Sequence, residues 1–175
     1  MGEYQGPRFS VRRVAKELPE IETKEFLELD RKLGDFLEPK GNQGNMSMRV
    51  PNGFLIKRAG ARMTELAGED VSLVLETGIE VVAAGAVPSS ESMLHYSIYG
   101  TDPYANLILH FHDDAMLERF EGPAIGPFPY GSVELAEAAG RIAESEKVFM
   151  IRGHGFVIIA KGGDELVERL KKWKR

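Results

Sequence analysis

Cysteine is absent from this chain of 175 residues. The absence excludes disulfides, thiolate metal ligands and cysteine nucleophiles, so any transition-metal site must use nitrogen and oxygen ligands. It also gives a weak preference for a reducing compartment.

An excess of basic charge and long apolar runs are also missing. The net charge of −5 argues against a nucleic-acid-binding protein, which normally needs a basic face for the phosphates. No apolar run reaches the length of a membrane span, and the first ten residues lack the apolar segment of a signal peptide. We therefore expect a cytoplasmic protein that binds neither nucleic acid nor membrane, whereas small anionic ligands stay allowed.

The pattern of apolar residues predicts the fold class. A hydrophobic content of 43% can fill one core, which favours a single domain over residues 1–175. Helices are predicted at 23–38, 89–100, 132–145 and 164–175, and short strands at 45–51, 53–58, 71–76, 80–85, 106–112, 147–152 and 156–160. Several neighbouring strands are joined too tightly for parallel crossovers. We expect an α/β fold of the α+β type, with a mainly antiparallel central sheet flanked by helices.

Two of the four histidines stand one residue apart at the end of an apolar strand, in "NLILHFHDD". Residues i and i+2 of a strand share a face, so His110 and His112 would project side by side. His154, in "RGHGF", would add a third imidazole, and three protein ligands with one open position are typical of catalytic zinc sites. By itself, the pair is more typical of partly buried histidines satisfied by hydrogen bonds than of a metal site.

Two further motifs carry polar groups next to glycines or a helix start. "VPSSESMLH" predicts a helix N-terminus whose free amides and serine hydroxyls could bind an anion, with Glu91 in the first turn. Its alternative is a capping serine with a glutamate that complements the helix dipole. "GNQGNMSMR" predicts a turn at Gly44 and Asn45 before a strand, and a plain glycine turn is the alternative.

Together these motifs resemble the class II aldolase and adducin family. The family's Gly-Asn-x-Ser-x-Arg turn matches Gly44, Asn45, Ser47 and Arg49. Its Pro-Ser-Ser-Glu motif matches residues 88–91, with His95 where that motif usually has a histidine. Its two histidine segments match residues 110–112 and 153–155, and all the motifs follow the family's order. The resemblance runs from about Glu25 to about Ala160. It implies a class II aldolase-like fold and a homotetramer.

The resemblance also implies the site. A zinc ion would be held by His110, His112 and His154, with Glu91 as general base. The substrate phosphate would be held by Gly44, Asn45, Gly60, Ser89 and Ser90. Zinc would act as a Lewis acid on the oxygens of an enediolate.

The implied activity is that of a class II aldehyde-lyase. It would cleave a phosphorylated, fuculose-1-phosphate-like ketose to dihydroxyacetone phosphate and an aldehyde. The alternatives are a sugar-phosphate epimerase or dehydratase on the same metal site, and a non-catalytic, adducin-like binding or assembly module.

The chain departs from the family pattern at two places. Ala59 stands where the family has a threonine, and although Lys57 or Arg58 could compensate, a solvated basic turn is the favoured interpretation. The segment after His112 is short and lacks the family's tyrosine general acid. Tyr130 and the Asp113–Asp114 pair are the nearby candidates, but a loop aromatic and a helix cap are the simpler interpretations.

Overall fold

The computed structural model describes residues 9–19, 21 and 23–174, so residues 1–8, on which the expected lack of a signal peptide rests, lie outside it. In the described part, nine strands form one sheet in the order β1-β5-β4-β3-β2-β6-β9-β8-β7. The strands are β1 (Ser10–Ala15), β2 (Asn45–Val50), β3 (Gly53–Lys57), β4 (Val71–Thr77), β5 (Glu80–Gly85), β6 (Leu107–Phe111), β7 (Ala124–Ile125), β8 (Val148–Ile151) and β9 (Gly155–Ala160). The helices are α1 (Lys24–Leu33), α2 (Ser92–Thr101), α3 (Asp114–Arg119), α4 (Val133–Ala143) and α5 (Gly163–Trp173), with a short 3-10 helix at Gly68–Asp70.

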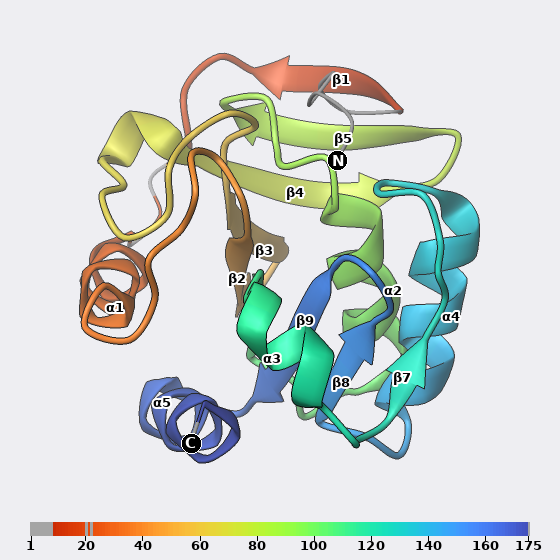
Figure 1. Ribbon diagram of the computed structural model, residues 1–175. Helices are drawn as coiled ribbons and strands as arrows, with labels where there is room; N and C mark the ends of the chain where they lie inside the picture. Colours follow the sequence, from red (N-terminus) through yellow and green to blue (C-terminus); the bar gives the residue numbers. More distant parts are fainter. Residues whose placement is uncertain (1–8, 20, 22, 175) are drawn as a thin grey trace.

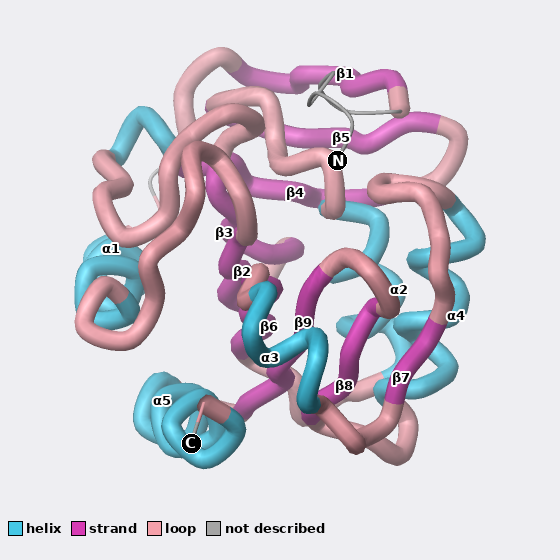
Figure 2. The backbone as a smooth tube through the Cα atoms, in the orientation of Figure 1, coloured by secondary structure: helices cyan, strands magenta, loops and turns pink. Residues whose placement is uncertain are grey.

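The sheet is mixed, which corrects the expected mainly antiparallel sheet at both edges. Its inner pairings are antiparallel, but β1 pairs parallel with β5, and β7 pairs parallel with β8. Neither edge strand was predicted, because the side chains of β1 are mostly exposed and β7 spans two residues of a proline-rich segment. The α/β fold class itself is confirmed. Figure 2 shows the strands as one twisted layer with helices beside it.

Both faces of the sheet are buried, because side chains alternate between two apolar layers. In β6, Leu107, Leu109 and Phe111 belong to the core layer beneath α1 and α5, whereas Ile108 belongs to the layer beneath α2 and α4. Figure 1 shows the first pair of helices on one side of the sheet and the second pair on the other. By the same alternation His110 points to the α2 side, which fixes the face on which the candidate site lies.

Helix ends differ from the sequence predictions by a few residues. Helix α1 stops at Leu33, before the predicted end, and Gly34 follows it as the C-cap. Glu91 is the N-cap residue of α2 and not a first-turn residue as expected. The acidic segment after His112 forms α3, where Asp113 Oδ1 accepts the backbone N–H of Met116 at 3.0 Å, so the predicted helix cap is confirmed.

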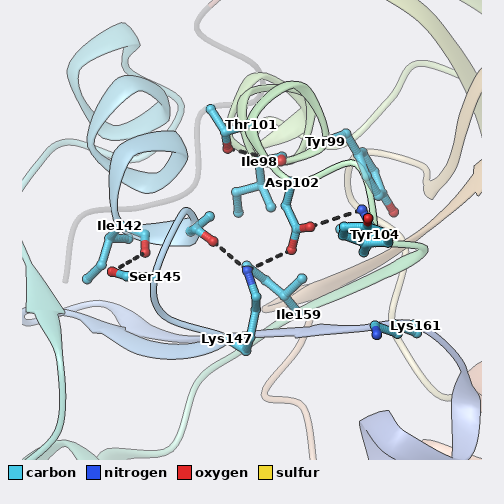
Figure 3. Close-up of polar contacts among 12 residues, drawn as sticks. Ile98, Tyr99, Thr101, Asp102, Tyr104, Ile142, Ser145, Lys147, Ile159 and Lys161 are labelled. Carbon is cyan, nitrogen blue, oxygen red and sulfur yellow. Dashed lines mark hydrogen bonds and ion pairs between the residues drawn. The ribbon is translucent and has the colours of Figure 1, made fainter.

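The C-terminal end of α2 is fixed by a partly buried ion pair (Figure 3). Lys147 Nζ lies 2.8 Å from Asp102 Oδ2 and donates to Ala143 O at 2.6 Å, and Tyr104 N donates to Asp102 Oδ1 at 3.0 Å. Burial alone would raise the pKa of Asp102, but Lys147 and the backbone N–H groups hold it below its usual value. The helix that carries Glu91 at its start is therefore anchored at its far end.

In the described part of the chain, no helix combines the length and the apolar content needed to cross a bilayer. One sheet carries both core layers, and the single domain over residues 1–175 stays a prediction.

Candidate metal centre

Three imidazoles from distant parts of the chain converge at the end of β6. Candidate ligand atoms of His110, His112 and His154 all lie within 4.8 Å of one another. His110 comes from β6, His112 follows directly after that strand, and His154 lies in the turn between β8 and β9. Two nitrogens on a tetrahedral zinc ion lie roughly 3.3 Å apart, given Zn–N bonds of about 2.0 Å. The spacing of the three rings therefore suits a metal ion.

The hydrogen bonds of His110 test this fit. His110 Nδ1 lies 3.0 Å from Phe156 O, and because a carbonyl only accepts, Nδ1 must carry the proton. In the neutral ring Nε2 is then a lone-pair acceptor. It nevertheless lies 3.0 Å from His112 Nε2 and 3.1 Å from Glu91 Oε2. A lone pair facing a carboxylate is repulsive, and a cation between the two would stabilise the arrangement.

His110 and His112 are held neutral, which is the state a metal ligand needs. Burial, together with the neighbouring imidazoles, lowers the pKa of His112 to about 3. Burial and the nearby His154 and His95 rings also lower the pKa of His110 well below its usual value.

Glu91 lies against this centre with one of its oxygens engaged. Asn45 Nδ2 donates to Glu91 Oε2 at 2.9 Å, and the two residues are almost fully buried. Glu91 Oε1 accepts no hydrogen bond from the described residues, and His154 Nε2, 3.2 Å away, is not aligned for one. A buried carboxylate with one free oxygen is suited to accept a proton.

Two glycines permit the close approach of the strands that carry these groups. A Cβ on Gly155 would lie 2.5 Å from Phe111 O and 3.0 Å from His110 Cε1. A Cβ on Gly44, whose φ is +74°, would lie 2.9 Å from His110 O. Glycine at position 155, in the "GHG" turn, therefore permits the close approach of β9 to β6.

The expected phosphate-binding residues are brought together by pairing between the β3 end and the segment before α2. Ala59 N donates to Val87 O at 2.9 Å, and Ser89 N donates to Lys57 O at 3.1 Å. A cavity of about 340 Å³ lies here. Its lining includes Glu91, His112 and His154. It also includes all five expected phosphate-binding residues, Gly44, Asn45, Gly60, Ser89 and Ser90. His110 is fully buried and is not among the lining residues of this cavity.

Lys57 corrects the interpretation of "KR" as a solvated basic turn. Arg58 is exposed and pairs with Asp70, but Lys57 is 2% exposed and lines the cavity. Its Nζ donates to Asn42 O at 2.7 Å and to Ala61 O at 2.5 Å. Burial lowers the pKa of Lys57 to about 8, although the Glu91 and Asp30 carboxylates act in the opposite direction. The alternation of β3, in which Leu55 and Lys57 share a face, was the signal that could have predicted this burial.

Tyr130 also lines the cavity. Asp114 is an exposed residue paired with Lys40 at 2.8 Å, and Asp113 caps α3. Among the candidates for a general acid, Tyr130 is therefore the residue with access to the site.

Comparison with known proteins matches this chain to one protein family. Residues 24–118 match the family model of the class II aldolase and adducin N-terminal domain. A 3-oxo-tetronate 4-phosphate decarboxylase from Pectobacterium atrosepticum is 31% identical over 145 residues, which cover 69% of this chain and 66% of that protein. An L-fuculose phosphate aldolase from Methanococcus vannielii is 27% identical over 157 residues, which cover 79% of this chain and 84% of that protein. The chain thus spans slightly less than two thirds of the length of the decarboxylase.

Solved structures show the same fold. YgbL from Klebsiella pneumoniae superimposes with a TM-score of 0.71 at 22% identity, covering 85% of this chain and 83% of that one. The L-fuculose-1-phosphate aldolase of Thermus thermophilus gives a TM-score of 0.68 at 21% identity, covering 84% of this chain and 85% of that one.

Proposed function

The chain belongs to the class II aldolase and adducin family, and from that premise we propose that it is a metal-dependent lyase acting on a phosphorylated sugar. The specific proposal is the cleavage of a fuculose-1-phosphate-like ketose to dihydroxyacetone phosphate and an aldehyde. The observation that carries it is the meeting of three imidazoles with a buried carboxylate that has one unbonded oxygen, beside a cavity lined by serine and glycine.

His110, His112 and His154 would hold the metal, which we propose is Zn²⁺. A bound divalent cation supplies Lewis-acid polarisation of the substrate's oxygens. The chain's own contribution is to orient the rings. Phe156 O fixes the tautomer of His110 so that Nε2 is available as a ligand.

Glu91 would act as the general base. Asn45 holds Oε2 by a hydrogen bond, so the free Oε1 is the atom that would take the proton from the carbon beside the carbonyl of dihydroxyacetone phosphate and, in the cleavage direction, return it to that carbon. Proton transfer by a positioned carboxylate contributes on the order of a hundredfold or more to the rate.

The phosphate would lie at the other end of the cavity. Ser89 and Ser90 precede α2, where hydroxyls and free backbone N–H groups favour an anion. Lys57 adds a positive charge that was not expected there, since two of the three ammonium protons engage carbonyls and the third is left for a ligand. Gly44, Asn45 and Gly60 would complete the binding site.

A second candidate function is the decarboxylation of a phosphorylated 3-oxo acid. The 31% identity to a decarboxylase favours it. Loss of carbon dioxide also forms no aldehyde, so it needs no group to exchange the proton on the aldehyde's oxygen, and this sequence has no clear counterpart of the family's tyrosine. Epimerisation and dehydration on the same metal site stay as alternatives. The retained histidines and Glu91 count against a non-catalytic, adducin-like module.

Assembly as a homotetramer and a cytoplasmic location stay predictions from the family resemblance and the sequence.

Proton exchange from dihydroxyacetone phosphate into deuterated water, followed by NMR, tests the proposed function directly. We expect the zinc-loaded protein to catalyse the exchange and Glu91→Gln to abolish it, because the amide cannot accept the proton. Glu76→Gln, an exposed residue of β4, serves as the matched control and should exchange like the wild type. Exchange that survives in Glu91→Gln would assign the base elsewhere.

A panel of ketose phosphates and phosphorylated 3-oxo acids separates the candidate reactions. Products identified by mass and NMR would distinguish an aldehyde from carbon dioxide. Turnover of none of these substrates would favour the binding module.

A further inference from the structure

A cluster of polar side chains lies between β2 and α2, behind the candidate metal centre. On β2 its members occupy alternate positions on one face, and on α2 they recur every four residues, so two regular spacings bring them together. The β2–α2 polar cluster consists of Asn45, Ser47, Arg49, Glu91, His95 and Tyr99.

Each strand residue of the cluster contacts a helix residue. Asn45 binds Glu91, as described above. Ser47 Oγ lies 2.6 Å from His95 Nδ1 and 2.8 Å from the Tyr99 hydroxyl. Arg49 Nη2 donates to Tyr99 O at 2.9 Å. Ser47 and His95 are fully buried, so their hydrogen bonds must be satisfied within the protein.

The contact distances favour one direction for the protons of this cluster. The Tyr99 hydroxyl can donate to Asn106 O at 3.3 Å or to Ser47 Oγ at 2.8 Å, and Asn106 O already accepts Arg49 N at 2.8 Å. With Ser47 as the nearer acceptor, Ser47 Oγ would donate its own proton to His95 Nδ1, 2.6 Å away. The single proton of the neutral His95 ring would then be on Nε2.

His95 Nε2 is buried and has no hydrogen-bond partner among the described residues. Burial lowers the pKa of His95 to about 4, and the Glu91 charge is close enough to act in the opposite direction. His95 lies one helical turn after Glu91, and His95 N donates to Glu91 O at 3.3 Å. Phe54 packs against both rings, with centroid distances of 6.5 Å to His95 and 5.2 Å to Tyr99, which restricts their rotation.

We propose that His95 is a positioning residue for Glu91, held by Tyr99 and Ser47 as the Nε2–H tautomer so that the positive end of this N–H dipole stabilises the Glu91 carboxylate in its place. The inference rests on the proposed function for its effect on catalysis. Its structural part, the tautomer, stands independently of the activity.

NMR of histidine-labelled protein tests the tautomer without any substrate. Long-range nitrogen–proton correlations distinguish the two neutral forms, and the His95 signals are assigned by their loss in His95→Asn. We expect the proton on Nε2. A proton on Nδ1 would overturn the proposal, whether or not the protein is active.

Two substitutions of His95 test the positioning role. Glutamine places an amide nitrogen near the position of Nε2, whereas asparagine reaches only the position of Nδ1. We expect His95→Asn to slow proton exchange by about tenfold or more, the scale of lost supporting contacts at metal sites. His95→Gln should stay within about threefold of the wild type, with KM and zinc content unchanged in both variants. Equal losses in the two variants would contradict the proposal.

A matched pair of serines controls for stability. Ser72 of β4 is fully buried like Ser47, and its Oγ donates to Ala86 O at 2.9 Å, away from the polar cluster. Ser47→Ala and Ser72→Ala should lower the melting temperature similarly, but only Ser47→Ala should slow the exchange. Similar exchange rates in the two variants would show that the cluster is merely structural. A wild-type protein without any exchange would contradict the proposed function but leave the tautomer result standing.

Discussion

Lys57 links the candidate site to the stability of the fold at the scale of a single residue. Its ammonium is buried beside Glu91, and burial lowers the pKa of Lys57 to about 8. The unfolded chain keeps a lysine pKa near 10.4, so it binds more protons than the folded chain between these two values. The free energy of unfolding therefore includes a penalty that is complete below pH 8 and disappears as the pH rises toward about 10.4.

The pH dependence of this penalty gives a prediction for the substitution of Lys57. In protein kept free of metal by a chelator, the unfolding free energy of the wild type relative to Lys57→Met should rise between pH 8 and 10.4, by at most about 3 kcal/mol. Urea unfolding at several pH values measures it. Lys161→Met, at an exposed lysine, is the control and should show no such rise. A flat difference for Lys57→Met would mean that the buried ammonium keeps an ordinary pKa.

Sequence patterns predicted the residues of the site better than their surroundings. His110 and His112 could be placed on one face because strand geometry is local, and the histidine, serine and glutamate motifs could be matched in order. The burial of Lys57 depends on carbonyls of two loops, at Asn42 and Ala61, which no local pattern specifies. The His95 contacts likewise depend on the register between β2 and α2.

At the scale of elements, the turn between β8 and β9 illustrates why glycine is needed. Gly155 begins β9 directly after His154, and a Cβ there would lie 2.5 Å from a backbone oxygen of β6. The two strands could not keep their pairing without a shift, and the shift would move His154 relative to His110.

We predict that Gly155→Ala lowers both thermal stability and zinc affinity. A backbone clash of this kind costs on the order of 1–3 kcal/mol, by analogy with overpacked cores. Gly100→Ala in α2, where a Cβ would meet nothing within 4 Å, should instead stabilise by about 0.5–1 kcal/mol through helix propensity. Thermal denaturation and zinc titration measure the two effects. Unchanged zinc affinity in Gly155→Ala would mean that the turn does not set the spacing of the imidazoles.

The helices and inner strands were predictable because their apolar periodicities are strong, whereas the edge strands were not. Strand β1 is mostly exposed, and β7 is too short to show an alternation. Strand β1 pairs with β5, which is distant in the sequence, and β7 pairs with β8, from which α4 separates it. Neither pair is joined by a tight turn that would have indicated the pairing.

At the scale of the whole molecule, the sheet brings together segments that are distant in sequence. Asn45 of β2 is the cross-strand partner of His110, and Val157 of β9 pairs with His110 from the other side. Helix α2 covers the same face and brings Glu91 and the two serines to it. The meeting of the three imidazoles with Glu91 is thus a consequence of strand order, which short motifs alone do not determine.

Equilibrium zinc binding tests the account most directly. Chelator-treated protein, titrated with zinc and read by calorimetry, should bind one ion per chain. Single alanine substitutions of His110, His112 or His154 should each weaken binding by at least about a hundredfold, because each removes a ligand of a three-imidazole site. Wild-type protein that binds no zinc, or three variants that bind it as tightly as the wild type, would contradict the central claim that these rings form one metal site.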